Sequence, residues 1–143
     1  QKYLMQGVRA VDTTLFSYKN KWRLFTNMLE VEGASVQDEL FLFYADSPLS
    51  NDWTSHPKNP IVADVRTSRP AGNIFIEKGK IIRPSQNSAI RYGHKVNLQE
   101  VLALSETEYR ETSWKEISPW SGDIFGIHTY NRSEKLTFVD LRE

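Results

Sequence analysis

The sequence has no cysteine, no net charge and no long apolar run. Without cysteine, the chain can form no disulfide, no thiolate zinc site and no cysteine nucleophile. Its 18 basic and 18 acidic residues balance, so no overall field attracts nucleic acid, and we expect no nucleic-acid partner. No apolar run approaches the roughly 20 residues that span a bilayer, and we expect no membrane segment.

The residues that are present predict one folded domain over residues 1–143. Hydrophobic residues make up 39% of the chain and aromatic residues 12%, a composition that favours strands over disorder. The sequence begins at Gln1 with neither an initiator methionine nor an apolar signal segment, so we expect it to be part of a longer protein. These features leave the cellular compartment open.

Three segments of the chain share one pattern, which indicates an internal repeat. In each, an aromatic residue is followed five positions later by lysine and then by a large apolar residue. The aromatic residues are separated by 59 and 55 positions. The residues concerned are Phe16, Lys21 and Trp22, then Phe75, Lys80 and Ile81, and then Tyr130, Lys135 and Leu136.

Each repeated segment predicts a tight β-hairpin. Asn20 and Gly79 are residue types that tolerate the positive φ of hairpin turns. The predicted turns lie at 18–21, 77–80 and 132–135, and the strands that follow them at 22–27, 81–83 and 136–141.

Further strands are predicted at 39–46, 94–101 and 109–117 from their apolar or alternating patterns. The spacing over 98–104 fits a short helix equally well. The fold class that we predict is all-β: a partial five-bladed β-propeller of about two and a half four-stranded antiparallel blades. The blade-like units run over residues 8–60, 61–120 and 121–143, and a plain β-sandwich is the alternative.

An open ring of blades would leave sheet faces and edges uncovered, because propellers close with roughly 4–8 blades. We therefore expect either self-association of two copies or further blades in a longer protein to complete the ring.

Four motifs carry a resemblance to a known family. They are LFYADS with DWTSHPKNP at 42–60, RPAGNIF with GKIIRPSQN and YG at 69–93, DTTLF at 12–16, and GIHTYN at 126–131. Together they resemble the N-terminal propeller domain of plant glucosamine inositolphosphorylceramide transferases, which also occurs in bacterial proteins with a formyltransferase-like domain. The chain is more distantly similar to the five-bladed furanosidase fold of family-43 glycoside hydrolases.

The resemblance implies a carbohydrate-recognition or accessory domain of a sugar-modifying protein, with a saccharide or glycoconjugate as ligand and no cofactor. Sugar transfer in the plant proteins belongs to a separate domain. A glycoside hydrolase of the furanosidase type and a protein-interaction scaffold are the alternatives. Fusion to a formyltransferase-like domain would imply the bacterial cytoplasm.

The resemblance to the hydrolases makes Asp12 a candidate general base. An inverting hydrolase also needs a protonated carboxyl group about 6.5–9.5 Å away. No acidic residue is singled out for this role, since the aligned stretch at 69–72 contains none. Asp12 is equally able to stabilise a turn or to pair with an arginine.

Four other residues are candidates for substrate binding: Arg69, Arg83, Gln86 and His128. Arginine presents a planar fork that suits phosphate, carboxylate or neighbouring hydroxyl groups, and glutamine offers a donor and an acceptor. The alternative role of the two arginines is to brace the blades through ion pairs. His128 aligns with an inner strand, and a structural role is its alternative.

Neither the spacing of the histidines nor the tryptophans predicts a further site. His56, His94 and His128 lack the spacing of metal ligands, so no metal site is predicted. The side chains of Trp53, Trp114 and Trp120 are interpreted as packing between blades rather than as a platform for sugar rings.

Overall fold

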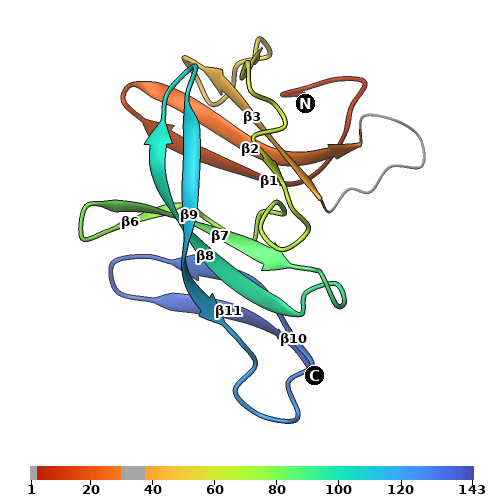
Figure 1. Cartoon of the computed structure of the whole chain (residues 1–143). Helices are drawn as coiled ribbons and strands as arrows, with labels where there is room; N and C mark the ends of the chain where they lie inside the picture. Colours follow the sequence, from red (N-terminus) through yellow and green to blue (C-terminus); the bar gives the residue numbers. More distant parts are fainter. Residues whose placement is uncertain (1–2, 30–37) are drawn as a thin grey trace.

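The computed structural model describes residues 3–29 and 38–143. Within these ranges every regular element is a β-strand, and the strands form three antiparallel sheets that follow one another along the chain (Figure 1). The same ranges contain no helix that is long and apolar enough to cross a membrane.

The first sheet has the order β1-β2-β3-β4, with β5 paired to β3 as well. Its strands are β1 (Arg9–Tyr18), β2 (Lys21–Leu29), β3 (Glu39–Ala45), β4 (Thr54–Ser55) and β5 (Val62–Ala63). Because β5 pairs with β3, this sheet continues beyond residue 60, where the first predicted unit ends.

The second sheet is a complete four-stranded meander, β6-β7-β8-β9. It consists of β6 (Phe75–Glu77), β7 (Lys80–Asn87), β8 (Lys95–Leu104) and β9 (Tyr109–Ile117). The ambiguous stretch 98–104 is therefore strand, and its burial alternates over much of its length. The third sheet is the hairpin of β10 (Gly126–Arg132) and β11 (Thr137–Arg142).

The three predicted hairpins are present, but only two share a register. Phe16 lies opposite Arg23, and Phe75 opposite Ile82, across two-residue turns whose residues all have φ between 49° and 79°. Tyr130 lies opposite Val139 instead, across a four-residue turn over 133–136. Lys135 thus lies within its turn, whereas the lysines of the other two repeats begin a strand.

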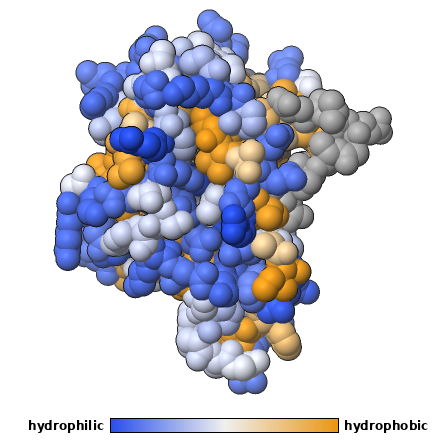
Figure 2. All heavy atoms as spheres, viewed as in Figure 1, coloured by the Kyte–Doolittle hydropathy of each residue, from blue (hydrophilic) through white to orange (hydrophobic). Residues whose placement is uncertain are grey.

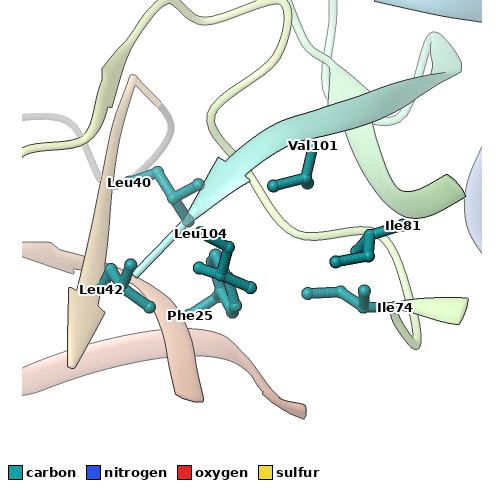
Figure 3. Packing of buried hydrophobic residues seen from close by; sticks show 7 residues of the cluster. All are labelled: Phe25, Leu40, Leu42, Ile74, Ile81, Val101 and Leu104. Carbon is teal, nitrogen blue, oxygen red and sulfur yellow. The ribbon is translucent and has the colours of Figure 1, made fainter. Parts of the chain in front are cut away.

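The sheets pack face to face, with the second sheet between the other two (Figure 1). In the first interface Phe25, Leu40 and Leu42 meet four residues of the second sheet and its approach, namely Ile74, Ile81, Val101 and Leu104 (Figure 3). Burying one such side chain contributes about 1.5–3 kcal/mol. This interface brings the first sheet against the second, and the site described below includes a further contact between Asp12 on β1 and Arg69 in the segment before β6.

The second and third sheets are joined by an apolar cluster that includes Phe75, Ile82, Ile127 and Tyr130, and by hydrogen bonds between main-chain groups. The amide of Tyr130 donates to the carbonyl of Ala71 at 2.7 Å, and that of Ile127 donates to the carbonyl of Gly93 at 2.9 Å. Gly72 has a φ of 129°, and a Cβ atom there would lie 2.2 Å from the Tyr130 carbonyl oxygen. Only glycine at position 72 allows this segment of the chain to approach the main chain of Tyr130 so closely.

The molecule is thus an all-β chain of stacked antiparallel sheets without a closed barrel, as a partial propeller requires. Both end faces of the stack carry apolar side chains. Leu24, Phe41 and Phe43 form a cluster on the first sheet, and Leu136 and Phe138 are exposed on the third. Figure 2 shows apolar patches between the mainly hydrophilic residues of one face.

Candidate functional site

Asp12 occupies an irregular point in the first strand. The register of β1 against β2 shifts between Val11 and Thr14, and Asp12 has a φ of 52°. A β-bulge bends the strand and redirects a side chain, and such backbone irregularities are common at functional sites. The bulge brings the carboxylate of Asp12 to the residues that precede β6.

Arg69 binds this carboxylate from the segment between β5 and β6. Its Nε atom donates to Oδ2 of Asp12 at 2.5 Å. Its guanidinium carbon lies 4.7 Å from the centre of the Tyr92 ring, and Nη2 is 3.5 Å from the Tyr92 hydroxyl. The main chain of Arg69 is fixed as well, because its carbonyl accepts from the amide of Gln86 at 2.8 Å.

Tyr92 extends the contacts to the third sheet. Its hydroxyl is hydrogen-bonded to Nε2 of His128, and the two ring centres are 4.9 Å apart. Nδ1 of His128 lies 3.5 Å from a carboxylate oxygen of Asp140 on β11. We call these five residues, Asp12, Arg69, Tyr92, His128 and Asp140, the Arg69 network.

The Arg69 network joins Asp12 on β1 of the first sheet to His128 and Asp140 on the two strands of the third sheet, through two loop residues: Arg69 before β6 and Tyr92 between β7 and β8. Arg69 is largely buried, but Tyr92 is 40% exposed, and the side chain of Asp12 is 30% exposed. The network therefore offers two carboxylates, a guanidinium, a phenol and an imidazole to a ligand at the surface. Such a mixture of donors and acceptors suits a polyhydroxylated molecule.

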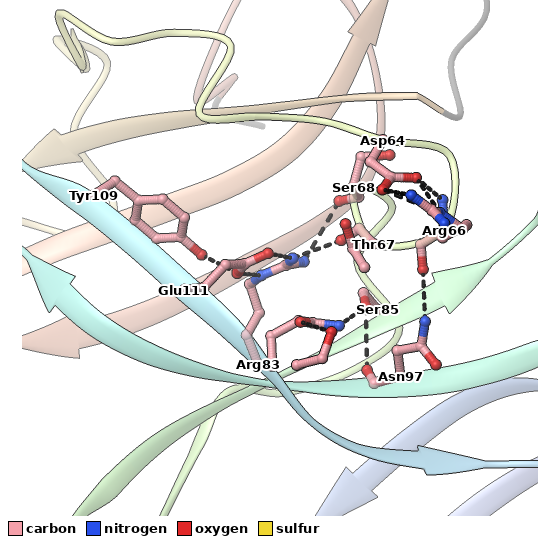
Figure 4. Close-up of polar contacts among 11 residues, drawn as sticks. Asp64, Arg66, Thr67, Ser68, Arg83, Ser85, Asn97, Tyr109 and Glu111 are labelled. Carbon is pink, nitrogen blue, oxygen red and sulfur yellow. Dashed lines mark hydrogen bonds and ion pairs between the residues drawn. The ribbon is translucent and has the colours of Figure 1, made fainter.

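Arg83 lies in a different environment, inside the second sheet (Figure 4). Its Nε and Nη2 atoms donate to the two carboxylate oxygens of Glu111 at 2.8 and 2.7 Å, and Nη2 also donates to the carbonyl of Thr67 at 2.6 Å. Tyr109 donates its hydroxyl proton to Glu111. We call Arg83, Glu111 and Tyr109 the Arg83 brace.

The pKa values of the brace reflect its burial. Burial raises the pKa of the Tyr109 hydroxyl well above its ordinary value. Burial is the largest single effect on the pKa of Arg83 and lowers it, but the charge of Glu111, the nearby Tyr109 and the hydrogen bonds to both together raise the pKa above its ordinary value. Arg83 is only 1% exposed, so its contacts match the bracing role that the sequence left open.

Gln86 is also enclosed. Its side chain is fully buried, its Nε2 atom lies 3.5 Å from the carbonyl of Pro70, and its Oε1 atom has no hydrogen-bond partner. The main-chain amide of Gln86 donates to the carbonyl of Arg69, so Gln86 supports the main chain of the Arg69 network. Of the predicted site residues, the structure thus connects Asp12, Arg69 and His128 directly, with Gln86 as support.

The sequence did not predict Tyr92 and Asp140 as site residues. Tyr92 stands in the Tyr-Gly pair of one family motif, which was the only signal available for it. Asp140 pairs with a residue 12 positions earlier, across an irregular hairpin. Within residues 3–29 and 38–143, no group of three histidine or acidic residues is arranged to hold a metal ion.

Fold and sequence comparison together define the class: this is an all-β domain associated with glycosyltransferases. Residues 1–121 match the family model described as glucosamine inositolphosphorylceramide transferase 1, N-terminal. The chain belongs to this family. His128 and Asp140 lie beyond the matched residues.

Two curated relatives come from rice, and both are called glucosamine inositolphosphorylceramide transferase 1. The proteins of the japonica and indica subspecies are each 34% identical to this chain over 103 residues. These residues are 71% of this chain but only 14% of each relative. No solved structure matches the chain significantly.

Proposed function

We propose that this chain is a carbohydrate-recognition domain that binds a glycoconjugate at the Arg69 network. One observation carries the proposal: Asp12 on β1, Arg69 and Tyr92 in two loops, and His128 on β10 form one connected group with an exposed ring. A bracing role alone would not require Tyr92 to be exposed.

The chemistry of the network suits a sugar with charged substituents. A carboxylate such as that of Asp12 accepts from hydroxyl or ammonium groups, and the fork of Arg69 donates to hydroxyl or phosphate oxygens. The name of the rice relatives contains an amino sugar and an inositolphosphoryl lipid. We therefore propose that the ligand belongs to this class, and that the catalytic step takes place elsewhere in the longer protein.

The contacts of Asp12 favour recognition over hydrolysis. A general base of an inverting glycosidase must take a proton from water opposite a second carboxyl group. Asp12 instead accepts a charge-assisted hydrogen bond from Arg69, so one of its carboxylate oxygens is already engaged. No contact described above favours a protein-interaction scaffold.

The proposal is tested by isothermal titration calorimetry with methyl glucosaminide and inositol 1-phosphate as probes. We expect Arg69→Ala to weaken binding of at least one probe by about tenfold or more, which corresponds to about 1.4 kcal/mol. Absence of binding by the unmodified protein to both probes would contradict the proposal.

Arg132→Ala is the matched control. Arg132 also pairs with a carboxylate, that of Glu77 at 2.8 Å, and also lies over a ring, that of Phe75 at 5.7 Å. It is at the opposite end of β10 from Gly126, away from the network. We expect it to bind both probes as the unmodified protein does, and an equal loss in both variants would refute a specific role for Arg69.

A further inference from the structure

A pocket of about 460 Å³ lies beside the outer strand of the second sheet, away from the Arg69 network. Its walls come from the segment 64–67, from β7 and β8, and from residues 113–116 of β9. A second pocket of about 420 Å³ shares Asp64, Thr67 and Ser113 with it. The two hollows therefore form one groove, which we call the Trp114 groove.

Trp114 lines this groove because the strand is irregular at that point. Lys115 pairs with Leu98 and Ser113 pairs with Gln99, so Trp114 is the extra residue of a β-bulge. A bulge redirects a side chain that regular pleating would place elsewhere. Trp114 is 39% exposed, so its indole ring is not packed between sheets as the sequence interpretation assumed.

The wall opposite Trp114 is held in place by polar contacts (Figure 4). Arg66 binds both carboxylate oxygens of Asp64 through Nε and Nη2, at 2.8 to 3.1 Å. The side-chain amide of Asn97 donates to the carbonyl of Arg66 at 2.9 Å. Segment 64–67 is thus anchored to β8 before any ligand arrives.

The charges in the groove are largely neutralised in pairs. Asp64 is paired with Arg66, and Glu116 is paired with Lys95 at 2.7 Å. The pKa of Asp64 is lowered by its hydrogen bonds from Arg66, so this carboxylate remains ionised. A ligand therefore meets these paired charges together with the ammonium group of Lys115.

Polar groups next to the indole ring of Trp114 remain available to hydrogen-bond a ligand. In the part of the chain that the structure describes, the Asn97 side-chain oxygen accepts no hydrogen bond and Lys115 forms no ion pair. Asn87 uses its side-chain oxygen for the amide of Ala89, which leaves its amino group to a ligand. An aromatic face flanked by both donors and acceptors matches a sugar ring, whose faces are apolar and whose edge carries hydroxyl groups.

We propose that the Trp114 groove is a second saccharide-binding site, which takes a neutral pyranose oligosaccharide and is independent of the Arg69 network. One sugar stacks on Trp114 while its hydroxyl groups bond to Asn87, Asn97 and Lys115. The continuation of the groove past Ser113 accommodates the next sugar of the chain. A peptide added along β9 would need apolar pockets for alternate side chains, and among the residues that line the first hollow Trp114 is the one large apolar side chain.

The test is ¹⁹F NMR on protein labelled with 5-fluorotryptophan, with cellopentaose, chitopentaose and mannopentaose as probes. The four tryptophans give four resonances, which single Trp→Phe variants assign. We expect at least one probe to shift the Trp114 resonance with a dissociation constant on the order of 1 mM or tighter. The resonance of Trp53, which packs against the core of the first sheet, should stay in place.

Variants distinguish stacking from an indirect effect. We expect Trp114→Ala to weaken binding of the active probe about tenfold or more, and Trp114→Phe to retain most of it. Trp120→Ala is the control, because Trp120 is 62% exposed but does not line the groove. Unchanged binding in Trp114→Ala, or a Trp114 resonance that no probe moves, would overturn the proposal, as would binding of an extended peptide alone.

The same experiment separates the two proposed sites. Arg69→Ala should weaken the response to at least one of the charged probes and leave the shift of Trp114 intact. If Arg69→Ala removed the Trp114 shift as well in a folded protein, there would be a single site and the proposal of a second one would be wrong.

Discussion

Two arginines that looked alike in the sequence have opposite surroundings in the structure. Arg83 lies within one sheet, where both of its bonding edges are used by Glu111 and the carbonyl of Thr67. Arg69 lies between sheets, bound to Asp12 on one side and lying over the exposed Tyr92 on the other. The two arginines therefore differ in their surroundings: the side chain of Arg83 is 1% exposed, whereas that of Arg69 is 10% exposed and lies beside a ring that reaches the surface.

The largest expected effect is on the Arg83 brace. Glu111→Gln keeps the shape of the side chain but leaves the charge of Arg83 buried without its partner. Removal of one member of a buried ion pair typically costs about 3–5 kcal/mol, so we expect a decrease of that size in the free energy of unfolding, measured by urea denaturation.

The double variant Arg83→Met with Glu111→Leu is the control for this experiment. It removes both charges and fills similar volume, so most of the lost stability should return. If the Glu111→Gln protein were as stable as the unmodified one, Arg83 would not act as a brace, and its role would no longer differ from that of Arg69.

A smaller effect on stability is expected at the Arg69 network. Asp12→Asn retains a residue type that tolerates positive φ, so the bulge should persist while the charge is lost. We expect the free energy of unfolding to decrease by about 1–2 kcal/mol, with a larger proportional loss of probe binding. Asp12→Ala should cost about 1–2 kcal/mol more, because alanine is strained at this φ. A stability loss equal to that of Glu111→Gln would show that Asp12 mainly braces the fold.

The smallest effect concerns His56, a buried polar side chain with no carboxylate partner. Burial and then the charge of Lys58 lower its pKa below the ordinary 6.5. The unfolded chain therefore binds more protons as the pH falls below about 6.5, and stability decreases in that range. Each unit by which the two pKa values differ contributes about 1.4 kcal/mol.

We expect His56→Gln to reduce the slope of stability against pH between about 6.5 and 5. His94 has a pKa lowered by burial too, so His94→Gln is needed to account for the remaining slope. Equal slopes in the unmodified protein and in the double variant would show that neither histidine titrates differently on folding.

Local signals in the sequence predicted most of the fold. Asn20 and Gly79 marked two of the turns, and strand β9 has the predicted bounds at residues 109 and 117. The third turn was misplaced, because its hydrogen bond between Ser133 and Leu136 closes a loop that the repeat pattern did not require. The two-residue strands β4 and β5 also escaped prediction, since they depend on pairing with β3 rather than on their own residues.

The site was less predictable, since its members meet only through sheet packing. Asp12 and Arg69 are 57 positions apart, and no local pattern connects them. Tyr92 and His128 meet across the joint between the second and third sheets, 36 positions apart. The exposure of Trp114 depends on a bulge that pairing with β8 creates. In each case the decisive contact is long-range, and the sequence alone does not specify it.

The contact between the second and third sheets around Gly72 can be compared with the point where the family match ends. The family match ends at residue 121, yet the stack of sheets continues to Arg142. Because amides and carbonyls make the bonds from Tyr130 to Ala71 and from Ile127 to Gly93, these two bonds do not depend on the side chains at those positions, whereas the apolar packing of Ile127 and Tyr130 does. The end of the sequence match is therefore not the end of the folded unit that the structure describes.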